Sequence, residues 1–431
     1  AVLWNVNPCY ALPEADSWRQ ALAKVPLRAG LHLTLDETAR ECQLVLPLHH
    51  WLESWGDYEP ALDLLSLQQP VIAPLFDTRQ AEDILLGLAA ELGGMAATGY
   101  RDVIRRRWER EVRPAASPLG FEAFWNAALH DGVLKREASP RPARQFDAAA
   151  VSEAARSLGQ VALAAATSAT GPALVLHPDT KLYDGRYADN GWLQELPEPL
   201  AKTVWGNALA LSPADAASPG IETGDLVEVS AGGRSLRLPS LVQPGQCEGV
   251  LSLALGYGRE TGSVGSGVGA NAYALLDAGS GLPYLFPNVA LSKTGEKGQL
   301  VRTQEHHSLH GRELVLNTTL AEYAHHGLGH ASHHPEGDLY EKLEFPEHHW
   351  GMVIDTNACV GCSACVMACQ SENNIPVVGP EQVERGRELH WIRLDTYHEG
   401  PPDNPTLVHQ PMLCQHCDKA PCENVCPVHA T

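Results

Sequence analysis

The sequence lacks any run of about 18 consecutive apolar residues, the length that a helix needs to cross a bilayer. Its first 18 residues also lack a positively charged stretch followed by a long apolar core, so no secretory signal is visible. We therefore expect no direct membrane span in this chain. Any contact with a membrane would go through partner proteins.

Basic residues are scarce relative to acidic ones. The chain has 31 Lys and Arg against 52 Asp and Glu, which gives a formal net charge of -21 at pH 7. A field of that sign repels phosphate backbones and anionic lipids. We therefore expect no nucleic-acid partner.

Several cofactor motifs are absent. No C-x-x-C-H occurs, which excludes covalent attachment of haem to this chain, and no G-x-x-x-x-G-K-[ST] loop occurs. The glycines between residues 256 and 269 do not follow the dinucleotide fingerprint, and we interpret them as turns. Nucleotide binding is therefore not expected.

Cysteine is rare in most of the chain. Residues 1–358 contain three, Cys9, Cys42 and Cys247, which we expect to be small buried apolar side chains rather than a disulfide framework. The other eight lie between Cys359 and Cys426. The chemistry of the chain is therefore expected near its C-terminal end.

The 431 residues suggest two to four domains. Residues 1–150 alternate short apolar runs with helical periodicity, which predicts a partial α/β domain. Strands are expected at 30–36, 42–47 and 71–76, and helices near 81–92 and 121–134.

Composition shifts near residue 150, where we place a domain boundary. Short apolar runs separated by Gly and Pro turns follow, and they predict a compact β-barrel within residues 151–290. Its strands are expected at 173–177, 225–230, 235–239 and 250–254.

Residues 291–349 are rich in histidine. They include His306, His307, His325, His326, His330, His333, His334, His348 and His349. A metal site is one interpretation, but the spacing is irregular and no C-x-x-C accompanies it, so an extended connector is favoured.

The first cysteine group has the spacing C-x2-C-x2-C-x3-C, with members Cys359, Cys362, Cys365 and Cys369. Bacterial two-cluster ferredoxins hold a [4Fe-4S] cluster with such a run, whose fourth cysteine ligates the other cluster. Gly361 permits the backbone turn between the first two thiolates. We expect the first three members to share one cluster and Cys369 to serve another.

The second group has the spacing C-x2-C-x4-C-x3-C-P, with members Cys414, Cys417, Cys422 and Cys426. Its longer gap indicates a small insertion rather than the loss of a ligand. By the same logic, Cys426 is expected to serve a different cluster from the other three.

Three alternatives compete with iron-sulfur clusters. One structural zinc would leave four cysteines unused, and disulfides would have to close across very tight turns. A Rieske centre would need two cysteines and two histidines, for which His416 and His429 are the candidates, but Cys417 and Cys422 would then be unexplained.

The last 80 or so residues resemble the four-cluster ferredoxin-like subunits that partner molybdopterin oxidoreductases. The resemblance rests on residues 350–355, 370–376 and the two cysteine groups. Upstream, residues 37–39, 44–47 and 53–57 resemble the third domain of a molybdopterin oxidoreductase. Residues 219–225 and 267–271 resemble its C-terminal double-psi β-barrel.

Both modules in one chain, in this order, resemble the fused B subunit of alternative complex III, a bacterial quinol-oxidising respiratory or photosynthetic complex. The resemblance implies an α/β plus β fold: a molybdopterin-oxidoreductase-like α/β domain and a double-psi β-barrel, followed by a partial ferredoxin-like iron-sulfur domain at 350–431. It implies [4Fe-4S] clusters and one [3Fe-4S] cluster, and no molybdopterin.

The same resemblance implies partners and a location. It implies an integral membrane subunit that binds quinol, and multihaem or monohaem cytochrome c subunits that receive the electrons. The location would be the periplasmic outer face of the bacterial inner membrane, reached through those partners. This chain would carry electrons and provide a scaffold rather than the substrate site.

The family has molybdopterin-like domains before this segment and further cysteine groups after it, so we expect the sequence to be part of a longer protein. The rival hypothesis is an active molybdopterin oxidoreductase, for instance of sulfur compounds, with its iron-sulfur subunit fused on. Asn271 would then be a candidate contact to the pterin, although Asn in a Gly-rich turn usually only shapes the turn.

Overall fold

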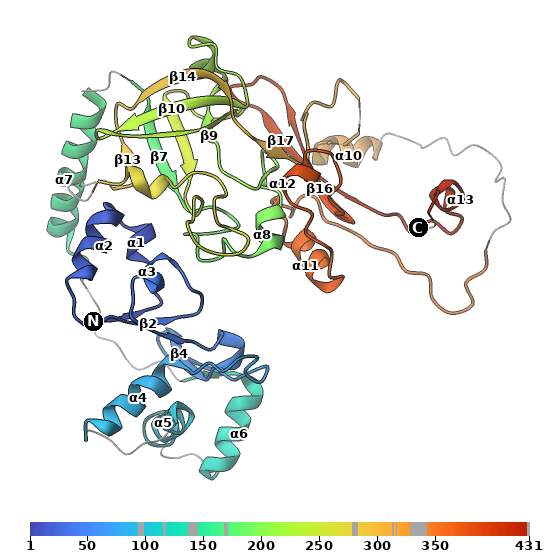
Figure 1. Cartoon of the computed structure of the whole chain (residues 1–431). Coiled ribbons are helices and arrows are strands. Elements are labelled where there is room, and N and C mark those ends of the chain that lie inside the picture. Colours follow the sequence, from blue (N-terminus) through green and yellow to red (C-terminus); the bar gives the residue numbers. More distant parts are fainter. Residues whose placement is uncertain are drawn as a thin grey trace. The chain divides into compact units, whose positions relative to one another are not determined.

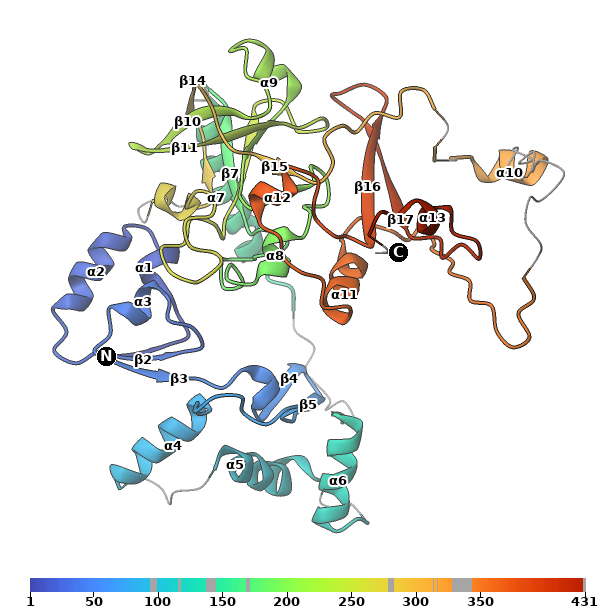
Figure 2. The same ribbon diagram turned by 45° about the vertical axis from the view of Figure 1, so that its right-hand side comes forward.

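The computed structural model describes residues 1–93, 99–114, 118–136, 145–167, 171–277, 283–312, 314–315, 317–327 and 343–428. These residues form two compact units (Figures 1 and 2). Unit 1 comprises Ala1–Ser168 with Glu260–Gly262, and unit 2 comprises Ala169–Arg259 with Ser263–Thr431. Helix α7, Ala148–Thr167, runs across the boundary that the sequence placed near residue 150.

The first part of unit 1 is a small parallel sheet. Its strands are β1 (Val2–Trp4), β2 (Ala29–His32) and β3 (Leu44–Pro47), in the order β1-β2-β3. The helices between them are α1 (Pro8–Ala11), α2 (Ala15–Ala23) and α3 (Glu37–Arg40). Asp36 starts α3 by accepting a hydrogen bond from the backbone N–H of Ala39 at 2.7 Å. The expected strands at 30–36 and 42–47 are therefore present but shorter.

The second part of unit 1 is an antiparallel sheet covered by helices. Its strands are β4 (Gly56–Ala61), β5 (Leu64–Gln68) and β6 (Val133–Lys135). The helices are α4 (Ala81–Glu91), α5 (Tyr100–Arg107), the π-helical turn η2 (Trp108–Val112) and α6 (Phe121–Asp131). The expected helix at 81–92 is confirmed. The one expected at 121–134 ends early, because Gly132 takes a left-handed conformation that terminates α6, and the chain continues as β6.

Large side chains fill the core of this sheet and its helices. Leu65, Ile104, Trp108 and Trp125 are almost completely buried there. The rings of Trp108 and Trp125 pack edge to face with centroids 6.0 Å apart. The strand β5 has its alternate residues buried, as expected for a sheet with one face on a core.

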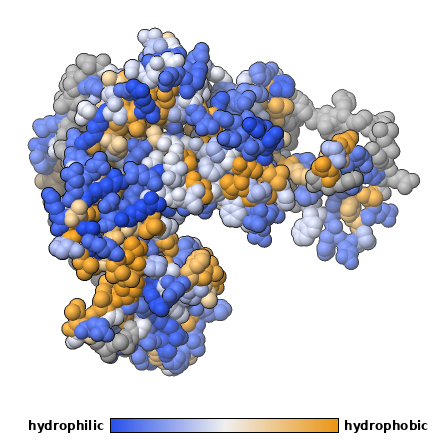
Figure 3. All heavy atoms as spheres, viewed as in Figure 1, coloured by the Kyte–Doolittle hydropathy of each residue, from blue (hydrophilic) through white to orange (hydrophobic). Residues whose placement is uncertain are grey.

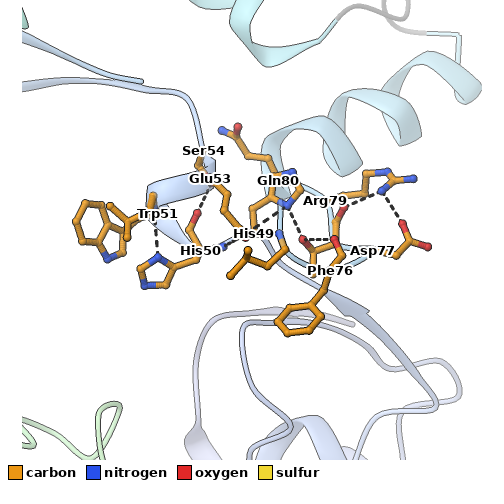
Figure 4. Close-up of polar contacts among 12 residues, drawn as sticks. His49, His50, Trp51, Glu53, Ser54, Phe76, Asp77, Arg79 and Gln80 are labelled. Carbon is orange, nitrogen blue, oxygen red and sulfur yellow. Dashed lines mark hydrogen bonds and ion pairs between the residues drawn. The ribbon is translucent and has the colours of Figure 1, made fainter. Parts of the chain in front are cut away.

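The expected strand at 71–76 is wrong, and Figure 4 shows why. The segment comes after β5 and is bonded to the short helix η1 (Trp51–Glu53), whose Glu53 carboxylate accepts the backbone N–H groups of His50 and Leu75, each at 2.8 Å. The backbone N–H of Val71 donates a hydrogen bond to the carbonyl of Leu52 at 2.7 Å. These bonds fix an irregular loop, so its apolar side chains stay outside: Phe76 is 78% exposed.

Unit 1 therefore exposes several large apolar side chains. Figure 3 shows apolar spheres gathered over part of this unit, and the exposed residues include Val71, Leu75, Phe76, Leu88 and Leu92. A run of apolar residues in a sequence does not separate a buried strand from a loop of this kind.

A seven-stranded mixed sheet forms the centre of unit 2, and we call residues 171–303 the sheet domain. The strand order is β13-β7-β12-β9-β11-β10-β14, and β15 pairs separately with β8. The bounds are β7 (Ala173–His177), β8 (Thr203–Val204), β9 (Leu209–Leu211), β10 (Asp225–Ala231), β11 (Arg234–Val242), β12 (Val250–Ala254), β13 (Leu285–Phe286), β14 (Ala290–Lys297) and β15 (Val301–Arg302).

The four strands predicted for this region are confirmed as β7, β10, β11 and β12. In β7, β10 and β12 alternate residues are buried, as expected for strands with one face on a core. Short helices connect them: α8 (Gly191–Glu195), α9 (Pro213–Ala217) and η3 (Ala272–Leu275). The side chain of Asn271 accepts the N–H of Tyr273 at 3.0 Å and so caps η3.

The three isolated cysteines differ in burial. Cys9 is 1% exposed, and burial raises its pKa, so the expectation of a buried side chain is confirmed there. Cys42 is half-buried. The expectation for Cys247 is wrong: it is exposed, because it lies in the loop that precedes β12 rather than in a strand.

The histidine-rich segment is described only in part. Its one described helix is α10 (Leu320–His326), which Thr319 and Glu322 start with a capping box. His330, His333 and His334 lie outside the described residues. None of the described helices is long and apolar enough to cross a membrane.

The cysteine groups lie in the last part of unit 2, and we call residues 355–428 the cysteine domain. Its elements are α11 (Ala364–Glu372), α12 (Pro380–Val383), the hairpin of β16 (Ile392–Glu399) and β17 (Thr406–Leu413), and α13 (Pro421–Val425). Helix α11 packs on α8 and on β16 (Figures 1 and 2).

Candidate iron-sulfur site

The first cysteine group lies on a loop and the helix that follows it. Cys359 and Cys362 are on the loop before α11, while Cys365 and Cys369 are one turn apart on α11 itself. Gly361 and Ser363 have φ of 73° and 60°, so the chain turns sharply between the thiols. This turn lets closely spaced cysteines project from successive positions of one loop.

Gly361 is also required for space. A β-carbon at this position would lie 2.4 Å from the ring of His409 on β17. The histidine is held by the Thr396 hydroxyl, 3.1 Å from its Nδ1. The hairpin therefore supports the loop that carries the first two cysteines.

The second group follows the hairpin directly. Cys414 comes immediately after β17, Cys422 lies on α13, and Cys426 ends that helix. Cys414, Cys417 and Cys422 are exposed, and Cys426 is half-buried. His429, one of the two histidines that a Rieske centre would need, lies outside the described residues.

No disulfide joins any of the eight cysteines. Within the described ranges, no three His, Cys, Asp or Glu side chains are gathered as a metal site. The fit to iron-sulfur clusters therefore rests on the donor atoms: two sets of four cysteine sulfurs, with the first set on a glycine-containing turn. The amide of Asn373 lies 3.5 Å from the sulfur of Cys369, a contact of the kind that tunes cluster thiolates.

The sheet domain contacts the first group closely. The half-buried Cys359 packs against a cluster whose buried members are Leu196, Val366 and Leu394. Leu196 follows α8 directly, so the sheet domain contributes to the surroundings of a predicted cluster ligand. Sequence reasoning gave no sign of this contact, because the two residues are far apart in the chain.

Glu195 at the end of α8 joins the two domains. Its carboxylate, in a side chain 3% exposed overall, accepts the backbone N–H of Gly379 at 2.9 Å and that of Val378 at 3.1 Å. It also accepts the indole N–H of Trp205 at 3.1 Å. A second link runs from the indole of Trp192 to the carbonyl of Ile375 at 2.7 Å.

Lys202 is buried beside the same junction, with 1% of its surface exposed. Its ammonium donates to the carbonyl of Pro199 at 2.7 Å. Burial lowers the pKa of Lys202 to about 8, and the negative charges of Glu198, Asp395 and Cys359 oppose that fall. The side chain is therefore mostly protonated at pH 7.

Several histidines at the junction are kept neutral. Burial lowers the pKa of His307 and of His390 to about 4, and it also lowers the pKa of His398. The rings of His307 and His398 stack with centroids 5.1 Å apart. His307 thus packs on the hairpin rather than joining a metal-binding cluster, at least among the described histidines.

Residues 358–430 match the family model described as a 4Fe-4S dicluster domain. This range contains all eight cysteines of the two groups. The C-terminal part of the chain is an iron-sulfur domain. The prediction of iron-sulfur chemistry is therefore confirmed, whereas the assignment of individual cysteines to individual clusters stays a prediction.

Curated relatives place this iron-sulfur domain among subunits of reductases. The chain is 41% identical over 83 residues to the iron-sulfur cluster-binding subunit of menaquinone reductase from Nitratidesulfovibrio vulgaris, covering 19% of this chain and 32% of that protein. It is 41% identical over 86 residues to the iron-sulfur subunit of a putative dimethyl sulfoxide reductase from Halobacterium salinarum, again 19% and 32%. The domain is related to iron-sulfur subunits of molybdopterin oxidoreductases, which supports a role in electron transfer.

A different subunit of the same menaquinone reductase also matches. The chain is 37% identical over 111 residues to its molybdopterin-binding-like subunit, covering 25% of this chain and 16% of that protein. The chain thus spans less than a third of the length of each of these three relatives.

Acetylene hydratase from Pelobacter acetylenicus is a solved structure with some likeness to this chain. The TM-score is 0.48 at 16% sequence identity, over 68% of this chain and 44% of that one. A likeness this weak supports no conclusion about fold or function. The expected double-psi topology of the sheet domain therefore stays a prediction.

Proposed function

We propose that this chain is the iron-sulfur electron-transfer subunit of a quinol-oxidising membrane complex of the alternative complex III type. Electrons would pass from a quinol site on an integral membrane partner, through clusters held by the eight cysteines, toward c-type haems on another partner. The clusters would be [4Fe-4S] with one [3Fe-4S], and the location would be the periplasmic face of the inner membrane.

One observation carries this proposal: a single chain is similar to two separate subunits of one enzyme, the molybdopterin-binding-like and the iron-sulfur subunits of a menaquinone reductase. The contacts of Glu195 and Trp192 across unit 2 support a permanent association of the two modules. Such an association suits a chain in which the first module serves as a scaffold for the second.

The second candidate is an active molybdopterin oxidoreductase with its iron-sulfur subunit fused on. It is favoured by relatives such as the iron-sulfur subunit of an arsenate respiratory reductase from Shewanella, which is 40% identical over 80 residues. Against it, Asn271, the candidate pterin contact, already caps η3 with its side-chain oxygen.

Analysis of the purified native complex separates the two candidates. We expect iron and acid-labile sulfide, no stoichiometric molybdenum, co-purifying haem-c polypeptides, and oxidation of quinols. Stoichiometric molybdenum would contradict the scaffold role. A complex without haem c that reduces quinones but oxidises no quinols would contradict the assignment to alternative complex III.

A further inference from the structure

Lys202 of the sheet domain places a positive charge in the buried region between that domain and the first cysteine group. The residue lies between α8 and β8 with φ of 58°, a strained conformation for a residue with a side chain. Its ammonium donates to a backbone carbonyl, and among the described residues no carboxylate forms an ion pair with it. Burying a cation in this way is costly unless nearby groups stabilise it.

Contacts connect this lysine to the cluster loop. The carbonyl of Pro199 accepts hydrogen bonds both from the ammonium at 2.7 Å and from the hydroxyl of Thr396 at 3.0 Å. Thr396 in turn contacts His409, whose ring lies against Gly361 between the first two cysteines. The position of Lys202 is thereby fixed relative to that loop.

Cys359 lies within electrostatic range of the ammonium. Its negative charge, as a thiolate, favours the protonated form of Lys202, as do those of Glu198 and Asp395. The charge of Lys202 also acts on His409, because it is the second cause, after burial, that lowers the pKa of that histidine. The lysine thus interacts with the first predicted cluster ligand and with the histidine that supports the loop.

A small polar cavity borders Lys202. The cavity has a volume of about 120 Å³, and its ionisable lining residues are Lys202, Glu388, His390, Arg393 and Asp395. Oε2 of Glu388 and Nε2 of His390 are buried and have no protein hydrogen-bond partner among the described residues. Such a space accommodates a few waters, which these atoms and the ammonium would share.

We propose that Lys202 raises the reduction potential of the cluster held by Cys359. The sheet domain would thus supply a positive charge that favours reduction of that cluster. This inference rests on the proposed function, since it requires the cluster. Reduction adds one electron from the donor to the cluster and breaks no bond. A fixed cation nearby stabilises the reduced, more negative cluster relative to the oxidised one.

The test is a redox titration of the intact complex followed by electron paramagnetic resonance. Lys202→Met should lower the equilibrium constant for reduction of one cluster by about tenfold, or about 59 mV for one electron. That size is expected when one unit charge is removed roughly 12 Å away at an effective dielectric constant near 20. Lys202→Gln serves as a second neutral variant that keeps a donor for the Pro199 carbonyl.

Two variants control for structural effects. Lys202→Arg keeps the charge and should stay close to the wild-type potential. Lys181→Met removes another buried lysine, which donates to the carbonyl of Thr203 at 3.3 Å and has no cysteine among the charges that act on it. It should leave the potential nearly unchanged.

Two outcomes would overturn this inference and leave the proposed function standing. In the first, both neutral variants keep full cluster occupancy and the wild-type reduction potential. In the second, Lys202→Arg shifts the reduction potential as much as Lys202→Met does. If the wild-type complex showed no cluster signal at all, the proposed function would fail and this inference with it. The two failures are therefore distinguishable.

Discussion

At the scale of single residues, Gly361 meets two requirements of its position, a positive φ and the absence of a β-carbon. Its φ of 73° disfavours a side chain, and its α-carbon faces the His409 ring so closely that a β-carbon would lie 2.4 Å from it. The loop of the first cysteine group is therefore set both by local backbone conformation and by a contact with the hairpin.

We expect Gly361→Ala to disrupt the first cysteine group. The left-handed conformation costs roughly 1 kcal/mol for a residue with a β-carbon, and the collision must also move the histidine or the loop. Iron and acid-labile sulfide per chain should fall by about the content of one cluster.

Gly386→Ala is the matched control, because Gly386 also has a positive φ of 63° but no atom near the position of a β-carbon. Equal iron loss in both variants would show that backbone strain, rather than the histidine contact, matters.

Asp225 stabilises the sheet domain as a buried carboxylate. It pairs with Lys293 and Lys297, each at 2.7 Å, and accepts the N–H of Glu222 at 2.7 Å. The hydrogen bonds from the two lysines hold the pKa of Asp225 far below its usual range. The group therefore stabilises the folded state above the ordinary carboxyl pKa near 4, and this contribution is lost as pH falls further.

Asp225→Asn should lower the midpoint temperature of thermal unfolding at pH 7. The difference in midpoint between the variant and the wild type should become smaller as the pH falls below about 4. Thermal unfolding followed by circular dichroism across pH 3–7 measures both midpoints. Glu228→Gln is the control, because its partner Arg237 is 65% exposed and such pairs contribute little. A gap that stayed constant with pH would contradict the role assigned to the charged carboxylate.

At the scale of elements, the end of α8 connects the sheet domain to the iron-sulfur domain. One carboxylate, that of Glu195, satisfies two consecutive backbone N–H groups before α12 and an indole N–H. Leaving a buried donor without a partner costs roughly 1–3 kcal/mol, so this one side chain has a large effect on the junction.

Glu195→Ala should weaken this junction by several kcal/mol, on the order of 1–3 kcal/mol for each donor left unpaired. Hydrogen exchange at Val378 and Gly379 should accelerate strongly, while strands β10 and β12 keep their protection. Glu381→Ala, at an exposed position of α12, is the control. Unchanged exchange at the two amides would show that other contacts hold the segment.

Helix α11 carries two predicted ligands one turn apart. In a ferredoxin-like run the third cysteine shares a cluster with the first two, whereas the fourth ligates a neighbouring cluster. Cys362→Ser and Cys365→Ser should therefore alter the same paramagnetic signal of the intact complex, and Cys369→Ser a different one. If all three changes affected one signal alone, the division of three to one would be wrong.

At the scale of the whole molecule, the iron-sulfur domain depends on the sheet domain for part of its core. Cys359 packs against the cluster that includes Leu196 of the sheet domain, and the hydroxyl of Thr396 donates to the carbonyl of Pro199. The hairpin also forms a backbone hydrogen bond with a residue outside the domain: the N–H of His398 donates to the carbonyl of His307 at 2.9 Å.

Isolated residues 350–431 should therefore assemble clusters poorly. A longer fragment, 171–431, keeps the sheet-domain contacts and should retain more iron and sulfide per chain after reconstitution under the same conditions. The readout is the metal content and the rate at which it is lost to a chelator. Equal content and equal rates for both fragments would contradict the dependence on the sheet domain.

The sequence by itself determined the chemistry and the strongest local elements. Cysteine spacing is a local property, so the two groups were enough on their own to indicate an iron-sulfur domain. The strands β10 and β12 and the helix α4 were predictable for the same reason: their period of apolar residues is set by neighbours along the chain. Segment 71–76 was mispredicted because its conformation depends on the Glu53 carboxylate 22 positions from Leu75.

Only the tertiary structure decided what surrounds the cysteines. Glu195 bonds to backbone N–H groups 183 positions away, and nothing in the local sequence marks Lys202 as a buried cation that interacts electrostatically with Cys359. A lysine in a loop is normally exposed, so a single sequence predicts a solvated side chain there. Its burial follows from the packing of α8 and its loop on α11 and β16, because long-range contacts, unlike periodicity and spacing, leave no pattern in neighbouring residues.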